Sequence, residues 1–334
     1  MTVVLAPPTT TISTTIYPAR LARSVPQPRR RSDTSPLRST DPVSVDSHRL
    51  LSRLGSGGMA DVYLAVAPAG RPVVVKVLRG GAAAADACRR EYRIASTMDP
   101  RSTTPALGHG VSAAGPYLIT AYLPEYRCAT MLAGEPIGTR QLWRFGSALA
   151  RTLAAVHARN IVHCDVKPAN LLVHNDDVRI IDFGIARHVG EAGGGGILEC
   201  SRGWAAPEQL WTTSATPAVD VFAWGCLLAQ RANGVHPFAS QSEREWILRL
   251  QSAQPDLFDL PSDLDEVIRA ALARDPQDRP TARELTAICQ DHGERQPSTM
   301  LLPSAVRGSH RGRRSSTPET RATTVQLTPA SRPR

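Results

Sequence analysis

The amino-acid sequence predicts an α+β fold of two lobes, in which a β-rich front lobe precedes an α-helical rear lobe. Short β-branched runs bounded by turn residues dominate residues 47–123, whereas apolar residues at helical spacing dominate residues 124–291. The 334 residues suffice for one such domain with two tails, and a hydrophobic content of 42% allows a sizeable core.

The front lobe is expected to begin near Ser47. The runs VYLAVAP and PVVVKVL flank Pro68-Ala69-Gly70, and this arrangement predicts a β-hairpin. Residues 82–98, AAAADACRREYRIASTM, are typical of a helix. The segment PYLITAYL predicts a further strand, after which the chain turns helical.

The rear lobe is expected to begin with a helix over residues 139–160. A buried stripe at helical spacing supports it, made of Leu142, Phe145, Leu149, Leu153 and Val156. Three short strands follow, IVH, LLV and RIIDF, and long helical patterns then run from about 217 to 289.

Both ends of the chain, residues 1–46 and 292–334, are rich in Ser, Thr, Pro and Arg and are expected to be disordered tails. The net charge of +9 lies there, because residues 1–47 carry +3, residues 293–334 carry +6 and the remainder is neutral. A folded nucleic-acid-binding domain would carry its own basic face, so nucleic acid is not the expected partner of the middle of the chain.

The six cysteines show no C-x-x-C spacing, which favours free thiols in a reducing cytosol over a zinc or redox site. No run of 18 apolar residues predicts a membrane span, and the first residues do not fit a secretory signal. A cytoplasmic protein without a membrane anchor is expected.

A glycine-rich segment, Leu54-Gly55-Ser56-Gly57-Gly58, lies between two strand-like runs. It is either an ordinary flexible turn or a hairpin whose glycines let backbone N–H groups lie against phosphates. A dinucleotide-binding loop would instead open a helix.

Lysine usage is the second signal. The chain has 37 arginines but only two lysines, Lys76 and Lys167, which is either chance or a need for a compact ammonium group. Glu91 follows Lys76 by fifteen residues on the predicted helix. A lone glutamate is usually a solvated charge, but beside Lys76 it is expected to hold the ammonium in place.

The third signal is the segment IVHCDVKPAN, a short loop between a helix and a strand. Asp165 is placed to accept a hydroxyl proton, Lys167 to neutralise a moving phosphoryl group and Asn170 to bind a metal. Asp182, after the strand RIIDF, suits Mg²⁺, which takes oxygen ligands and bridges phosphates.

These residues, in this order, resemble the eukaryotic-like (Hanks-type) protein kinase family over roughly residues 48–290. The resemblance rests on GSGGMADVY, VVVKVL, Glu91, HCDVKPAN, DFG, AAPE, DVFAWG and DPQDRP. The form GGMADVY is similar to bacterial serine/threonine kinases. The resemblance implies a two-lobed protein kinase fold, the cofactors ATP and Mg²⁺, and a protein substrate.

The resemblance also implies a role for each matching residue. The ATP-binding set is Leu54, Gly55, Gly57, Val62, Lys76, Glu91, Tyr122 and Leu123. The catalytic residues are Asp165 and Lys167, and the metal ligands are Asn170 and Asp182. In the rear lobe, Glu208 and Arg279 are expected to form an ion pair, and Asp220 to support the catalytic loop.

The chain departs from the family pattern before the catalytic aspartate, where Cys164 replaces an arginine that would bind a phosphorylated activation loop. Between Asp182 and Glu208 there is no Thr or Tyr and one serine, Ser201. We hypothesise that activity does not require phosphorylation of this loop. Ser201 is expected to hydrogen-bond Asp165 or Lys167, Cys164 to be a buried, unreactive thiol, and Gly193–Gly196 to make the loop flexible.

Three alternatives stay open at this point. A pseudokinase or scaffold would bind ATP and partners without turnover. A small-molecule kinase would lack the protein-substrate platform that the AAPE segment and Arg279 predict. Basic tails that bind nucleic acid would be an added role. The tails also contain Thr317 and Thr320, which are either autophosphorylated docking sites for phosphothreonine-reading domains or part of an inert solubilising segment.

Overall fold

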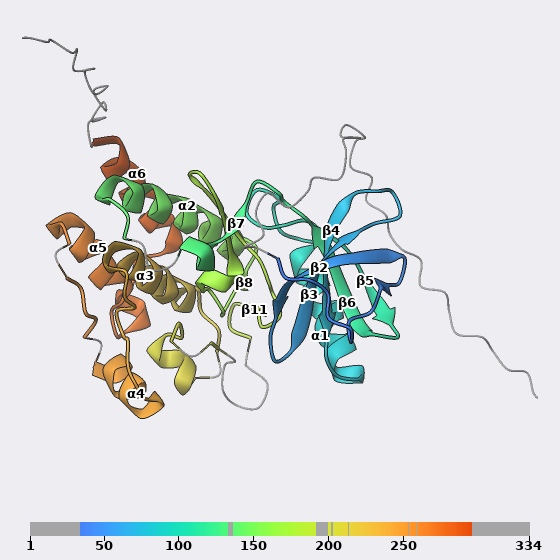
Figure 1. Cartoon of the computed structure of the whole chain (residues 1–334). Coiled ribbons are helices and arrows are strands. Elements are labelled where there is room, and N and C mark those ends of the chain that lie inside the picture. The colour runs from blue at the N-terminus through green and yellow to red at the C-terminus, as the bar shows by residue number, and fades with distance from the viewer. Residues whose placement is uncertain are drawn as a thin grey trace, which may run out of the picture. The chain divides into compact units, whose positions relative to one another are not determined.

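The front lobe is an antiparallel sheet with one helix packed on it, as the right-hand part of Figure 1 shows. The computed structural model describes residues 34–132, 136–191, 200–201, 203–212, 214–252, 254–258 and 260–295. The sheet has six strands in the order β1-β2-β3-β4-β6-β5. Its strands are β1 (Ser44–Val45), β2 (His48–Ser56), β3 (Ala60–Val66), β4 (Pro72–Leu78), β5 (Ala106–Ser112) and β6 (Gly115–Ala121).

Strand β4 shows how the sequence builds this sheet. Val73, Val75 and Val77 are buried and pack with Tyr63 and Ile119 in the core of the lobe, while the intervening residues are less buried. Because side chains alternate between the faces of a strand, this pattern points Lys76 to the face opposite the valines. The predicted hairpin is confirmed, with Gly70 at φ +76° in its turn.

The helix of the front lobe, α1 (Ala82–Ala95), packs against β4, β5 and β6. It ends three residues before the predicted end at 98. The Ser96 hydroxyl donates to the Tyr92 carbonyl at 2.6 Å and the Thr97 hydroxyl to the Ile94 carbonyl at 2.8 Å. The Thr97 backbone N–H bonds the Ile94 carbonyl at 3.0 Å, an i→i−3 bond that tightens the last turn as the helix ends.

Strand β5 was not predicted, because Gly108 and Gly110 weaken its strand pattern. The structure gives Gly110 a packing role: a Cβ at this position would lie 2.6 Å from the Tyr117 hydroxyl oxygen. The glycine is therefore required by the neighbouring strand β6, which a local sequence pattern does not reveal.

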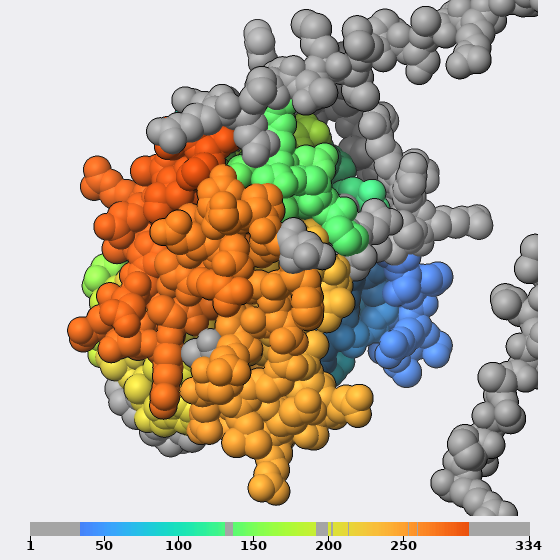
Figure 2. All heavy atoms as spheres, turned by 90° about the vertical axis from the view of Figure 1, so that its left-hand side faces the viewer, coloured from blue at the N-terminus to red at the C-terminus, as the bar shows by residue number. Residues whose placement is uncertain are grey.

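The rear lobe is helical and is built around α2 (Thr139–His157), which packs on α6, α3 and β10. Trp143, Leu149, Leu153 and Val156 of α2 are fully buried in its core. The other helices are α3 (Pro217–Asn233), α4 (Glu243–Ser252), α5 (Ser262–Ala271) and α6 (Ala282–Arg295). Figure 2 shows that the face at this end of the molecule is formed largely by the α4 to α6 region, in orange.

Short strands connect these helices at the boundary between the lobes. They are β7 (Arg127–Cys128), β8 (Ile161–Val162), β9 (Leu171–His174), β10 (Asp177–Ile180) and β11 (Arg187–His188). Short 3₁₀ turns lie beside them: η1 (Ala129–Leu132), η2 (Pro168–Asn170), η4 (Pro207–Leu210) and η5 (Pro276–Asp278). The predicted strands IVH, LLV and RIIDF thus occur, although the last ends at Ile180, before the aspartate.

The ordered body is larger than the range 47–291 expected from composition. Residues 34–46 pack against β2 and β3 instead of forming part of a tail, and α6 continues to Arg295. The N-terminal extension is ordered because Leu37 and Val45 join the apolar core of the front lobe. Within the described residues, no helix combines the length and apolar character needed to cross a membrane.

Candidate active site

The two lobes meet at Lys76 of β4. Its Nζ donates to both carboxylate oxygens of Glu91 in α1, at 2.9 Å each, and to Oδ1 of Asp182 at 2.6 Å. Glu91 is 2% exposed, whereas the Asp182 side chain is 41% exposed. The ammonium group predicted to meet phosphates is therefore fixed by a carboxylate behind it and reaches a second carboxylate that faces solvent.

Electrostatics in this cluster follow from one cation shared by two carboxylates. Burial raises the pKa of Glu91 to about 7, even though the Lys76 ammonium acts to lower it. Burial also acts to raise the pKa of Asp182, but Lys76, the Gly184 N–H and His163 together outweigh it and the net shift is downward. The carboxylate that is open to solvent is thus held ionised, as a cation ligand must be.

Asp182 follows β10 in a backbone conformation with φ +68°, which is uncommon for a residue other than glycine. The Gly184 N–H donates to its Oδ1 at 3.2 Å. The neighbouring Ile181 N–H donates to the Asn170 carbonyl at 2.9 Å, so the two predicted metal-binding residues come from adjacent segments. Amide and carboxylate oxygens are ligands that Mg²⁺ prefers, and these residues fit it.

The loop between β8 and β9 carries the other polar residues. Lys167 Nζ donates to Asp165 Oδ2 at 2.8 Å, and Asn170 Nδ2 donates to Asp165 Oδ2 at 3.0 Å and to its carbonyl at 2.8 Å. The remaining oxygen, Oδ1 of Asp165, is buried without a hydrogen-bond partner among the described residues. A buried, unpaired carboxylate oxygen is costly, and a hydroxyl donor would satisfy it.

Asp220 of α3 is only 1% exposed and supports this loop through hydrogen bonds. Its carboxylate accepts the backbone N–H groups of His163 and Cys164, each at 2.9 Å, and lies 2.9 Å from Nε2 of His157. Cys164 has φ +65°. The Asp220 hydrogen bonds hold this strained backbone, and with it the direction of Asp165.

Gln209 of η4 is a supporting residue that the sequence did not predict. It is 1% exposed, and its Nε2 donates to the Cys164 carbonyl at 3.1 Å. No local motif marks it, because its partner lies forty-five positions away in the sequence. Cys164 itself is buried, and burial raises the pKa of its thiol, which matches the expected unreactive side chain.

Ser201 belongs to the same polar cluster as Asp165 and Lys167. Its hydroxyl lies 2.5 Å from Lys167 Nζ, so Lys167 bridges Ser201 and Asp165. Trp204, three residues later, packs edge-on against His236 with ring centroids 4.8 Å apart. The glycine run 193–196 lies outside the described residues.

The glycine-rich hairpin joins β2 and β3. Gly55 pairs with Val62, and the Gly57 N–H donates to the Ala60 carbonyl at 2.9 Å. A Cβ at Gly55 would meet nothing within 4 Å, and one at Gly57 only the Ala60 carbonyl at 4.0 Å. Leu54 lies near the end of β2, before the tip of the hairpin. Tyr122 and Leu123 directly follow β6.

The predicted ion pair of the rear lobe is present. Arg279 donates to Oε1 of Glu208 at 2.6 Å and to Oε2 at 2.8 Å, and it also reaches the carbonyls of Ala218 and Ala273. Its guanidinium lies over the Phe222 ring, 4.9 Å from the centroid. The pair joins the segment after Ser201 to the helical core.

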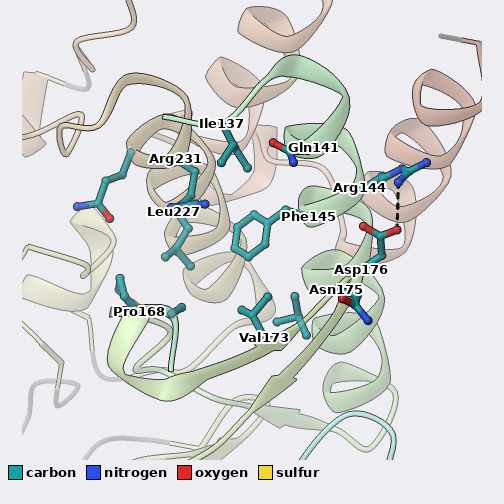
Figure 3. Close-up of a pocket in the computed structure, with 14 residues that line it drawn as sticks. Ile137, Gln141, Arg144, Phe145, Pro168, Val173, Asn175, Asp176, Leu227 and Arg231 are labelled. Atoms are coloured by element: carbon teal, nitrogen blue, oxygen red, sulfur yellow. Dashed lines mark hydrogen bonds and ion pairs between the residues drawn. The ribbon is translucent and has the colours of Figure 1, made fainter. Parts of the chain in front are cut away.

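A cavity of about 390 Å³ lies elsewhere, between α2, α3 and β9. Figure 3 shows Ile137, Phe145 and Leu227 in its wall and the Arg144–Asp176 ion pair at 3.3 Å on one side. None of the predicted phosphate or metal residues lines it, so we place no chemistry there.

Comparisons with known proteins agree with this geometry. The protein kinase domain family model matches residues 48–289. A probable serine/threonine-protein kinase, PkwA of Thermomonospora curvata, is 38% identical over 266 residues, which are 77% of this chain and 36% of that protein. The serine/threonine-protein kinase AfsK of Streptomyces coelicolor is 30% identical over 299 residues, 85% of this chain and 37% of that protein. The chain thus spans little more than a third of the length of these two relatives.

Proposed function

This chain belongs to the protein kinase domain family, and from that membership we propose that it is a serine/threonine kinase that transfers the γ-phosphoryl group of ATP to a protein hydroxyl. The observation that carries the proposal is the approach of Lys76 in the front lobe to Asp182 in the rear lobe, at 2.6 Å. This contact supports a single site in which Lys76 would bind phosphate beside Asp182 as a metal ligand.

In the proposed reaction the acceptor hydroxyl oxygen forms a bond to the γ-phosphorus while the bond from that phosphorus to the β,γ-bridging oxygen breaks, leaving ADP. Asp165 accepts the hydroxyl proton, for which its unpaired Oδ1 supplies the acceptor. Lys167 offsets the charge of the moving phosphoryl group. Mg²⁺, held by Asn170 and Asp182, would neutralise the phosphate oxygens.

The nucleotide is proposed to lie under the glycine-rich hairpin. The protein itself leaves room for a Cβ at Gly55 and Gly57, so the absence of side chains there is useful for something that approaches from outside, such as a phosphate. Leu54 and Val62 would cover the nucleotide, and the backbone of Tyr122 and Leu123 would hydrogen-bond adenine.

We further propose that turnover does not depend on phosphorylation of the activation loop. Cys164 stands where the family pattern has an arginine that binds a phosphorylated activation loop. Its side chain is a buried thiol without charge and offers no such binding group. Its backbone is already held by Asp220 and by Gln209, at 2.9 and 3.1 Å. These contacts need no phosphate. They therefore support a catalytic loop, between β8 and β9, that is assembled in the unmodified protein.

Partners and location are proposals of the same kind. A protein kinase domain acts on protein substrates. Thr317 and Thr320 lie outside the described residues, and we propose them as autophosphorylation sites that dock phosphothreonine-reading domains. All six cysteines are free, which supports a reducing cytoplasm.

The test is turnover of Mg²⁺-ATP by purified full-length protein with mass-spectrometric phosphosite mapping. Wild type is expected to phosphorylate Ser or Thr, and both Asp165→Asn and Lys76→Met to lose activity about a hundredfold or more. Binding of ATP without turnover by wild type would favour the pseudokinase or scaffold alternative. Activity that requires a phosphate on Ser201 would contradict the proposed independence of loop phosphorylation.

A further inference from the structure

Residues 34–46, which we call the strap, run along the outside of the front lobe. Ser35 exchanges backbone hydrogen bonds with Arg53 of β2, at 2.9 and 2.8 Å, and β1, at the end of the strap, pairs with β2. Leu37 and Val45 pack into the core of the lobe. The strap is thus attached to the strand that leads into the glycine-rich hairpin.

A buried charge connects the strap to the sheet. The Arg53 guanidinium binds Asp41 of the strap with one nitrogen and Asp61 of β3 with the other. Arg53 and Asp41 are each only 5% exposed. The Tyr63 hydroxyl donates to Asp41 at 2.9 Å, and the Arg38 N–H donates to it at 2.7 Å. A buried guanidinium needs paired partners, so Asp41 and Asp61 together hold Arg53 in one position.

Asp61 links the Asp41–Arg53 ion pair to the glycine-rich hairpin through Arg79. Its Oδ2 accepts from Arg79 Nη2 at 2.8 Å, and Arg79 Nη1 donates to the Gly57 carbonyl at 2.6 Å. The Arg79 backbone N–H also donates to the Met59 carbonyl at 2.8 Å. An unbroken series of contacts therefore runs from Asp41 through Arg53, Asp61 and Arg79 to the tip of the hairpin.

We propose that Asp41, Arg53 and Arg79 are positioning residues for the nucleotide, and that the Asp41 carboxylate is the group that connects the strap to the glycine-rich hairpin. The inference rests on the proposed function. Glycines at the hairpin tip leave the backbone free to adopt many conformations. A hydrogen bond to the Gly57 carbonyl restricts that peptide, and so fixes the direction of the N–H groups that are to face the phosphates. Loss of the strap contact releases the hairpin and weakens ATP binding.

The first test compares Asp41→Asn with Asp46→Asn in the full chain, using the Kd for Mg²⁺-ATP and steady-state kinetics. Both residues lie in the strap, but the Asp46 carboxylate interacts with the hydroxyls of Ser47 and Tyr117, and among the described residues it has no hydrogen bond or ion pair with Arg53. Asp41→Asn is expected to raise the Kd and the KM for ATP about fivefold with kcat within about twofold, and Asp46→Asn to leave all three within about twofold.

The second test is a double-mutant cycle between residues that do not touch. If the effect of Asp41 travels through Arg79, then Asp41→Asn will change the Kd by less than about twofold in an Arg79→Met background. Arg79 is 49% exposed, so this variant is expected to fold. Arg71→Met, at the other end of the β3–β4 hairpin, is the matched control and is expected to bind ATP like wild type. If Asp41→Asn does not fold, Arg79→Met against Arg71→Met still tests the contact with Gly57.

Each of the following results would overturn the inference: equal Kd changes for Asp41→Asn and Asp46→Asn, additive effects in the cycle, or Arg79→Met that binds ATP like wild type. A fall in kcat with an unchanged KM would likewise assign the network to general stability. Failure of the wild-type protein to bind Mg²⁺-ATP would instead refute the proposed function, so the two failures are distinguishable.

Discussion

The Asp220 carboxylate accepts a backbone hydrogen bond from His163 at 2.9 Å and another from Cys164 at 2.9 Å. These two contacts join the first turn of α3 to the catalytic loop across more than fifty positions of sequence. They place the strained Cys164 backbone, and the residue after it is Asp165. The position of the proposed proton acceptor is thus determined by a helix that contributes no group to the reaction itself.

Replacement of Asp220 by Asn is expected to damage both stability and catalysis. One carboxylate oxygen becomes an NH₂ group that faces an N–H donor, so a buried donor is left without a partner. We expect a loss of about 1–3 kcal/mol in the free energy of unfolding and a fall in kcat of about tenfold or more. Urea denaturation and kinetics measure the two. Asp176→Asn, at a 65% exposed side chain, is the control and is expected to leave both unchanged; wild-type kcat in Asp220→Asn would contradict the supporting role.

Ser201 is expected to act through Lys167. In Ser201→Ala the ammonium loses its 2.5 Å partner and is free to leave Asp165, so kcat should fall about tenfold with little change in the KM for ATP. Ser201→Thr retains the hydroxyl and is expected to restore activity. Steady-state kinetics of the two variants decide the point. Equal losses in both would indicate that packing, and not the hydrogen bond, determines the effect.

The Glu208–Arg279 pair is expected to stabilise the rear lobe. The Arg279 side chain is fully buried, so Arg279→Met leaves the Glu208 carboxylate without its cation and should cost about 3–5 kcal/mol of unfolding free energy. The double variant with Glu208→Gln removes that unpaired charge and should recover part of the loss. Denaturant midpoints for both variants measure this. A double variant as unstable as the sum of its single changes would argue against direct coupling.

His236 is expected to make stability sensitive to acid. Burial lowers the pKa of His236 to about 4, and the Arg249 cation adds to that effect. The Phe238 N–H donates to its Nδ1 at 3.1 Å, which requires the neutral ring. Because the folded state binds fewer protons than the unfolded state between about pH 4 and 6.5, stability falls as the pH is lowered through this window, by about 3 kcal/mol.

His236→Asn removes the titration and keeps an acceptor for Phe238. Its free energy of unfolding is expected to depend less on pH between about 6.5 and 4 than that of wild type. Urea denaturation at several pH values measures the slope. Identical slopes in the two proteins would show that other groups cause the acid sensitivity.

The fold class, the two lobes and the residues of the proposed site could all be predicted from the amino-acid sequence. The reason is local: alternation around Lys76 specifies a half-buried strand, helical spacing specifies α2, and the segments around Asp165 and Asp182 carry their chemistry within a few consecutive residues. The pairing of Lys76 with Glu91 was also predictable, because both belong to the front lobe and are fifteen residues apart.

The distant groups that hold these residues in place could be identified only in the folded protein. Gln209 reaches Cys164 from another segment, Gly110 is required by the Tyr117 ring, and Asp41 pairs with Arg53 although composition assigned it to a tail. These contacts depend on where packing brings separate segments together, and no periodicity of the local sequence encodes that. The residues of the proposed site could therefore be predicted from the sequence, whereas the contacts that orient them could be found only in the folded protein.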